Sequence, residues 1–184
     1  MRDLIKINID GKKVFVLFVL TNIVYIFMLT VSIPTVMSFA RGMKLLDMIP
    51  LGYTSEYVNL LLTTLGETGR QAYLFYQIPI DMVYPALFGI SNCLVLAYFL
   101  NKLGKLNHNV FYLCLLPLLG GLFDYFENIG IILLIKSFPN NSDFLSQLTN
   151  LFSVMKSSFT TIYFIVIIIV LVLTGINKLK SINI

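Results

Sequence analysis

The sequence predicts an all-α, polytopic integral membrane protein: a four-helix transmembrane bundle with a short amphipathic helix in the first outer loop. Three observations favour this fold class. The 184-residue chain is 58% hydrophobic and 12% charged, and its mean hydropathy of +0.87 is too high for a soluble domain of this size. Four apolar runs each reach the roughly 20 residues that cross a bilayer. We therefore expect one transmembrane domain, residues 1–184.

The first span is expected at residues 14–37, directly after a basic N-terminal segment. This run is longer than the apolar core of a signal peptide, which is about 7–15 residues, so we interpret it as a retained helix. It carries Asn22 and Tyr25 near its middle. Pro34, near its outer end, is expected to kink or end the helix.

The amphipathic helix is expected within residues 38–72, where charged residues interrupt any spanning run. Residues 57–65 are apolar and follow Thr54, which is a good helix N-cap. Gly66 and Gly69 then favour a break in the chain. We expect a short helix on the outer surface, either as a connector packed over the bundle or as a lid.

The remaining spans are expected at residues 71–101, 110–135 and 154–175, with loops at 102–109 and 136–153. Basic residues set the orientation, since they are enriched on the cytoplasmic side. The terminal side carries eight of them: Arg2, Lys6, Lys12, Lys13, Lys102, Lys105, Lys178 and Lys180. The other side carries five: Arg41, Lys44, Arg70, Lys136 and Lys156. This bias predicts that both termini are cytoplasmic.

Acidic residues inside the third span are the strongest functional signal. Asp124, Glu127 and Asn128 are spaced i, i+3 and i+4, so they share one helix face. Each acid near the bilayer centre opposes insertion by roughly 2.5–3.5 kcal/mol. Such acids are retained where they face protein or water, and they are functional more often than structural.

Counting along the helices places further polar residues in the same layer. At about 1.5 Å per residue, Asp81 enters to about the depth of Glu127, and Thr160 and Asn22 reach a similar level. We therefore predict a pocket in the outer half of the membrane. Arg70 is a candidate counter-charge for its acids. Tyr84 and Tyr125 add hydroxyl groups.

These residues favour binding of, or acid–base chemistry on, a lipid or other small hydrophobic molecule. The catalytic candidates are Glu127 as acid or base, Asp124 to tune it, and Asp81 to orient the substrate. The ligand-binding candidates are Asn128, Arg70, Tyr84, Tyr125 and Asn22. One alternative is a proton- or cation-coupled transporter or transporter subunit, which would require a homo-oligomer. Another is a non-catalytic assembly partner whose acids only pack helices.

Other classes of site are weakly supported by the sequence. An all-oxygen metal site at Asp81, Asp124, Glu127 and Asn128 would suit Mg²⁺, Ca²⁺ or Mn²⁺. The single histidine, His108, lies in a loop, and we expect no metal and no cofactor. The net charge of +4 does not indicate nucleic-acid binding. The helical plan resembles the layout of sterol-isomerase-related four-helix membrane proteins, but no motif accompanies the resemblance. Whether the protein is an enzyme stays open.

Overall fold

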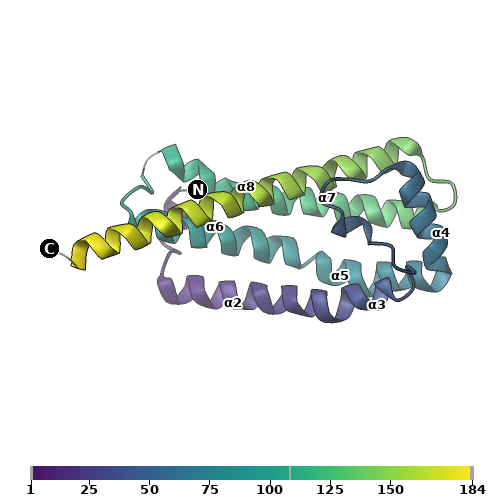
Figure 1. Cartoon of the computed structure of the whole chain (residues 1–184), viewed down its shortest axis with the longest axis horizontal. Coiled ribbons are helices and arrows are strands. Elements are labelled where there is room, and N and C mark those ends of the chain that lie inside the picture. Colours follow the sequence, from purple (N-terminus) through teal and green to yellow (C-terminus); the bar gives the residue numbers. More distant parts are fainter. Residues whose placement is uncertain (1, 108, 183–184) are drawn as a thin grey trace.

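The computed structural model describes residues 2–107 and 109–182, and across these ranges it is all helical. This confirms the all-α prediction. Four helices are long and apolar enough to cross a membrane: Gly11–Met37, Ser55–Lys102, Asn109–Ser137 and Asp143–Lys180. They run side by side as a bundle (Figure 1). Both termini lie at one end of this bundle, with the connection between the second and third helices, while residues 38–54 and 138–142 lie at the other end.

The first long helix joins α2 (Gly11–Phe27) to α3 (Ile33–Met37) through a π-helical turn, η1 (Met28–Ser32). A separate short helix, α1 (Arg2–Lys6), precedes it. Asp10 caps α2 because its carboxylate accepts the backbone N–H of Lys12 and Lys13. Pro34 does not end this helix, which continues to Met37. Proline has no backbone N–H to donate, and the wider π turn just before it accommodates this missing hydrogen bond.

The second long helix consists of α4 (Ser55–Ala72), the π turn η3 (Tyr73–Gln77), α5 (Ile78–Asp81) and α6 (Tyr84–Lys102). The predicted short helix is thus the first half of α4, and it runs on into the span through a kink at Gly66. Gly66 has φ +63° and ψ −176° there, a conformation that favours glycine.

The amphipathic half of α4 covers one end of the bundle (Figure 1). Its apolar face follows the helical spacing i, i+3, i+4 and i+7 and is almost fully buried. That face consists of Val58, Leu61, Leu62 and Leu65. Gly69 does not break the helix as expected; a Cβ there would lie 2.7 Å from Phe39 Cβ, so the glycine permits close packing.

The third and fourth long helices form an antiparallel pair. The third begins with the 3₁₀ segment η4 (Asn109–Leu115) and continues as α7 (Leu116–Ser137). The fourth, α8, spans Asp143–Ile182 without interruption. The loop expected at residues 136–153 is therefore short, because α8 begins one residue after Ser142, whose hydroxyl accepts the Leu145 N–H at the helix start.

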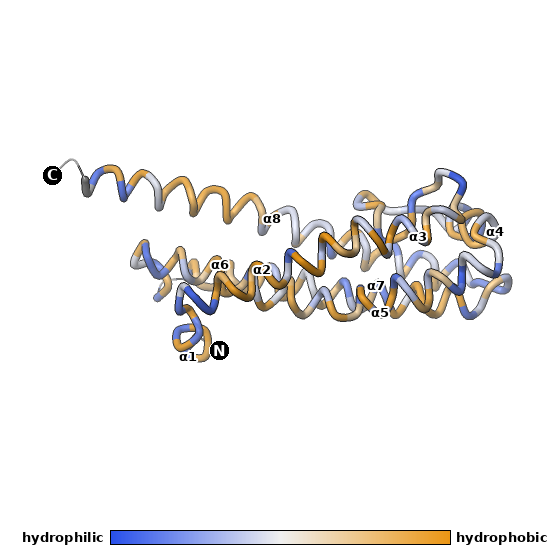
Figure 2. Tube along the Cα trace, turned by 90° about the horizontal axis from the view of Figure 1, so that it is seen from below, coloured by the Kyte–Doolittle hydropathy of each residue, from blue (hydrophilic) through white to orange (hydrophobic). Residues whose placement is uncertain are grey.

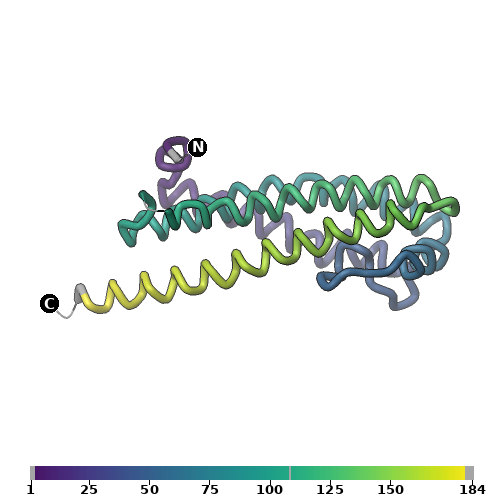
Figure 3. Tube along the Cα trace, turned by 90° about the horizontal axis from the view of Figure 1, so that it is seen from above, coloured from purple at the N-terminus to yellow at the C-terminus, as the bar shows by residue number. Residues whose placement is uncertain are grey.

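Two apolar clusters fill the bundle, one toward each end. The first combines residues of α3, α4 and α7 with the 3₁₀ turn η2 (Leu46–Met48), and the second combines residues of α6, η4 and α8. Tyr84 packs against both clusters. The C-terminal half of α8 diverges from its neighbours (Figures 2 and 3) and is mostly exposed and apolar. The polar residues of the spans lie between the two clusters.

Candidate functional site

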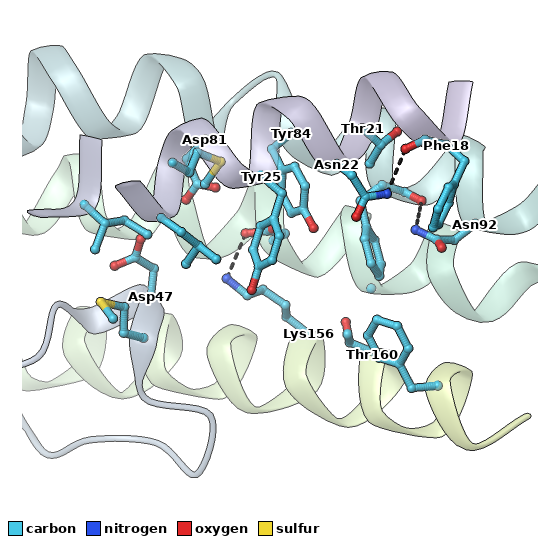
Figure 4. A pocket seen from close by; sticks show the side chains of 18 residues that line it. Phe18, Thr21, Asn22, Tyr25, Asp47, Asp81, Tyr84, Asn92, Lys156 and Thr160 are labelled. Atoms are coloured by element: carbon cyan, nitrogen blue, oxygen red, sulfur yellow. Dashed lines mark hydrogen bonds and ion pairs between the residues drawn. The ribbon is translucent and has the colours of Figure 1, made fainter. Parts of the chain in front are cut away.

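A cavity of about 470 Å³ occupies the region where the polar residues gather (Figure 4). All four long helices and the turn η2 contribute residues to its wall. The side chains with polar groups are Thr21, Asn22, Tyr25, Asp47, Asp81, Tyr84, Asn92, Asp124, Lys156 and Thr160. A cavity of this volume is within the range of about 300–1,000 Å³ that is usual for small-molecule sites.

Lys156 of α8 is the cation at the centre of this site. Its Nζ lies 3.0 Å from Asp124 Oδ1 and also forms an ion pair with Glu127 Oε2. The Glu127 side chain is fully buried, and the Lys156 side chain is 19% exposed. Burying a charge is costly unless an opposite charge lies beside it. The ion pairs with Lys156 therefore explain how α7 can bury both of its acids. The three groups together carry one formal negative charge.

Small residues of α7 bring the triad together. Asp124 and Glu127 lie on the buried face of α7, as their i, i+3 spacing predicts. The same face carries Gly120, which lies against Thr160 of α8, and Gly130, which lies against Thr149. Side chains at these glycines would hold α8 away from α7. The close approach of the two helices allows Lys156 to reach both acids.

Asp81 is the acid without a hydrogen-bonded partner. It lies at the end of α5, is 3% exposed and lines the cavity. Within residues 2–107 and 109–182, no group donates a hydrogen bond to its carboxylate. Its backbone carbonyl accepts a 2.9 Å hydrogen bond from Asn128 Nδ2, which fixes the end of α5 against α7.

Asp47 reaches the cavity from the connection between the first two long helices. It lies in η2, where its carboxylate accepts hydrogen bonds from Tyr73 Oη at 2.7 Å and Gln77 Nε2 at 3.1 Å. Gln77 Oε1 in turn accepts the Ser32 hydroxyl at 2.6 Å, which links the two π turns. Tyr53 follows η2; burial, and then the nearby Glu127 carboxylate, raise the pKa of its hydroxyl. The two hydrogen bonds of Asp47 attach the turn η2 to the second long helix, where the turn forms part of the cavity wall.

Aromatic side chains form the rest of the wall. Tyr25 stacks on Tyr84 with ring centroids 5.4 Å apart, and both side chains line the cavity with Lys156. Phe18, Tyr25 and Phe164 line the cavity and are also 41%, 41% and 49% exposed on the outside of the bundle. Phe18 and Tyr25 belong to α2 and Phe164 to α8, so partly exposed side chains of both helices line the cavity.

The structure brings together most of the residues that the sequence singled out. Asn22, Asp81, Tyr84 and Asp124 line the cavity. Glu127 lies behind its wall in the triad, as does Asn128, whose amide holds the end of α5.

Arg70 and Tyr125 do not line the cavity. Arg70 was the expected counter-charge, and the structure assigns that position to Lys156 instead. The Arg70 guanidinium donates to the Leu62 carbonyl at 2.8 Å and lies 4.4 Å from the centroid of the Phe138 ring. It thus satisfies a carbonyl near the α4 kink, where the regular hydrogen bonding of the helix is interrupted.

Sequence reasoning missed Lys156 and Asp47. The sequence prediction places Lys156 with the basic residues outside the membrane. Thr160, only one helical turn further on, is predicted in the polar layer, and this neighbour is the signal that could have indicated Lys156. Asp47 carries no helical pattern that could have indicated its position. No group of three or more His, Cys, Asp or Glu side chains among the described residues is arranged to hold a metal ion.

No protein-family model matches the chain, and no curated protein or solved structure matches it either. Its function must therefore follow from the chemistry of the cavity.

Proposed function

We propose that this chain is a multi-pass membrane protein that binds an amphipathic small molecule, of the lipid class, in the cavity between its helices. The observation that carries the proposal is the polarity of the cavity. The carboxylates of Asp47 and Asp81 lie at one end and the rings of Tyr25 and Tyr84 in the middle (Figure 4). The other end carries Phe18 beside polar side chains without charge, those of Thr21, Asn22 and Asn92. A molecule with a polar group and an apolar chain matches this division, because each part would meet the surroundings that it prefers.

We infer from the exposure of Phe18, Tyr25 and Phe164 that the cavity opens sideways, between α2 and α8, which supports entry from the membrane rather than from water. This opening is bordered by the apolar faces of α2 and α8, and only 17% of the most apolar stretch of each of these two long helices is buried within the protein. In a bilayer, these faces contact acyl chains. A lipid-like molecule would then move from the acyl-chain region into the cavity without crossing a polar surface.

The proposed orientation has both termini in the cytoplasm. Because Lys156 is paired inside the bundle, the side opposite the termini retains four of the basic residues counted above, and the bias toward the terminal side increases. We expect a membrane-impermeant maleimide to label Asn140→Cys in intact cells and to leave Lys105→Cys unlabelled. Both positions are exposed, at opposite ends of the bundle, whereas Cys93 and Cys114 are buried. The reverse labelling pattern would overturn the orientation.

A single tryptophan makes binding measurable, because the chain contains none. Phe164→Trp puts a fluorescent ring at the rim of the cavity, and Ile165→Trp puts one on the neighbouring, 54% exposed position that does not line it. In nanodiscs, we expect a brominated long-chain alcohol to quench the Phe164→Trp protein with a saturable dependence on concentration. The Ile165→Trp protein should be quenched only in proportion to the alcohol dissolved in the lipid.

A cavity-filling variant provides the decisive comparison. Asn22 lines the cavity, and its side chain bonds only to the Phe18 carbonyl in its own helix. Asn22→Phe in the Phe164→Trp background should therefore fold normally and lose the saturable component, with an apparent affinity at least about 10-fold weaker. Equal, non-saturable quenching of the Phe164→Trp and Ile165→Trp proteins would contradict the proposed function.

A further inference from the structure

The carboxylates of the cavity outnumber its cations. Asp47, Asp81 and Asp124 line it and Glu127 lies behind its wall, and they are set against Lys156 alone, which leaves a formal excess of three negative charges at the cavity. Two of these acids already share Lys156, and Asp47 already accepts two hydrogen bonds. The remaining acid, Asp81, has neither.

Asp81 is an acceptor aimed into the cavity. Only 3% of its surface is exposed, and Figure 4 shows its carboxylate on the same side of the cavity as Asp47. A buried carboxylate without a hydrogen-bond donor or a cation is costly. Neighbouring Asp124 and Asp47 add to the negative potential at this position. A positively charged group at Asp81 would relieve both costs.

We propose that the ligand is a cationic amphiphile, whose ammonium group binds Asp81 and whose hydrocarbon chain lies toward Phe18 and Phe164. This inference rests on the proposed function and specifies its ligand class. An ammonium group donates hydrogen bonds to carboxylates and, since it has no lone pair, needs no donor from the cavity wall. The stacked rings of Tyr25 and Tyr84, which line the same cavity, offer aromatic faces that also attract cations.

Lys156 does not oppose this assignment. Its ammonium group is neutralised by Asp124 and Glu127, so the triad as a whole is negative. A carboxylate ligand, by contrast, would face Asp47 and Asp81 without a free cation among the described residues of the cavity wall. The expected order of affinity is therefore amine above alcohol above carboxylate.

The test uses the Phe164→Trp protein in nanodiscs of zwitterionic lipid, with brominated amine, alcohol and carboxylate probes of one chain length. We expect the amine to bind about 10-fold or more tightly than the alcohol, because a hydrogen bond between charged groups is stronger than a neutral one. Equal saturable binding of amine and alcohol would overturn the inference and leave the proposed function standing. An absence of saturable binding by all three probes would overturn both.

The Asp81→Asn variant tests whether Asp81 is the residue that causes the preference for the amine. In the same background it should lower the affinity for the amine to that for the alcohol, and the affinity for the alcohol should stay within about twofold. Unchanged alcohol binding also reports that the cavity is intact. Glu56→Gln, which removes an exposed acid outside the cavity, should change neither. An amine preference that survives in Asp81→Asn would refute the role of Asp81.

If Asp81→Asn fails to fold, the comparison of the three probes on the unmutated cavity still tests the charge of the ligand. Raising the ionic strength adds a second readout, since screening is weak inside a buried site. The amine preference should therefore persist at high salt. A preference that disappears with salt would reflect attraction to the protein surface and would overturn the inference.

Discussion

Lys156→Met is expected to destabilise the protein by about 3–5 kcal/mol, because it leaves two buried carboxylates without their cation. Asp124 and Glu127 both pair with Lys156, and few alternatives are within reach, since Arg70 is engaged at the α4 kink. Methionine preserves the length and apolar stem of the lysine, so lost packing contributes little. Chemical unfolding in detergent, followed by circular dichroism, measures the change.

The matched control removes the whole triad. Asp124→Asn and Glu127→Gln added to Lys156→Met replace three charges by neutral groups of similar shape, and replacing a complete buried ion network is often neutral or stabilising. We expect the triple variant to recover most of the lost stability. If Lys156→Met alone unfolds like the unmodified protein, the triad does not hold α7 to α8.

Gly121→Ala is expected to destabilise the packing of α6 against α7. A Cβ at this position would lie 2.6 Å from the backbone carbonyl oxygen of Pro85 at the start of α6. Backbone atoms of a packed helix cannot rotate away, so α6 and α7 must separate. Overpacking of this kind costs about 1–3 kcal/mol, and the better helix propensity of alanine offsets only about 1 kcal/mol of it.

Gly175→Ala is the control for helix propensity. Nothing lies within 4 Å of a Cβ at Gly175, so this variant should gain stability or leave it unchanged. Thermal unfolding of both variants in the same detergent checks the pair. A Gly121→Ala protein as stable as Gly175→Ala would mean that α6 and α7 do not approach this closely. Because Pro85 follows Asp81 by one helical turn, the same variant should also weaken ligand binding.

The sequence predicted the fold class and much of the cavity wall because both depend on local periodicity. The spacing of Asp124 and Glu127 places them on one face of α7 whatever the rest of the chain does. A constant rise per residue likewise places Asn22, Asp81 and Thr160 near enough in depth to line one cavity. These inferences require only that the helices are straight enough and cross the membrane once.

The charge balance of the site could not be obtained in the same way. Two basic residues, Arg70 and Lys156, lay close enough to the acids along the chain, and hydropathy placed both at the ends of spans. The choice between them depends on the kink at Gly66, which directs Arg70 toward a helix carbonyl. It also depends on the early start of α8, which places Lys156 well inside a helix. Asp47 depends on the path of a whole connecting segment, which no local pattern encodes.

The length of α8 has a mechanical consequence for access to the cavity. Its 40 residues extend about 60 Å at 1.5 Å per residue, twice the roughly 30 Å of hydrocarbon in a typical bilayer. Its first half is anchored to α7 through Lys156, and its second half diverges with few neighbours. A helix of this kind meets changes in bilayer thickness by tilting. In the proposed membrane topology, a thinner bilayer would tilt the free half of α8 about its anchored half and alter the gap to α2, so that the composition of the bilayer would act on the proposed entrance to the site.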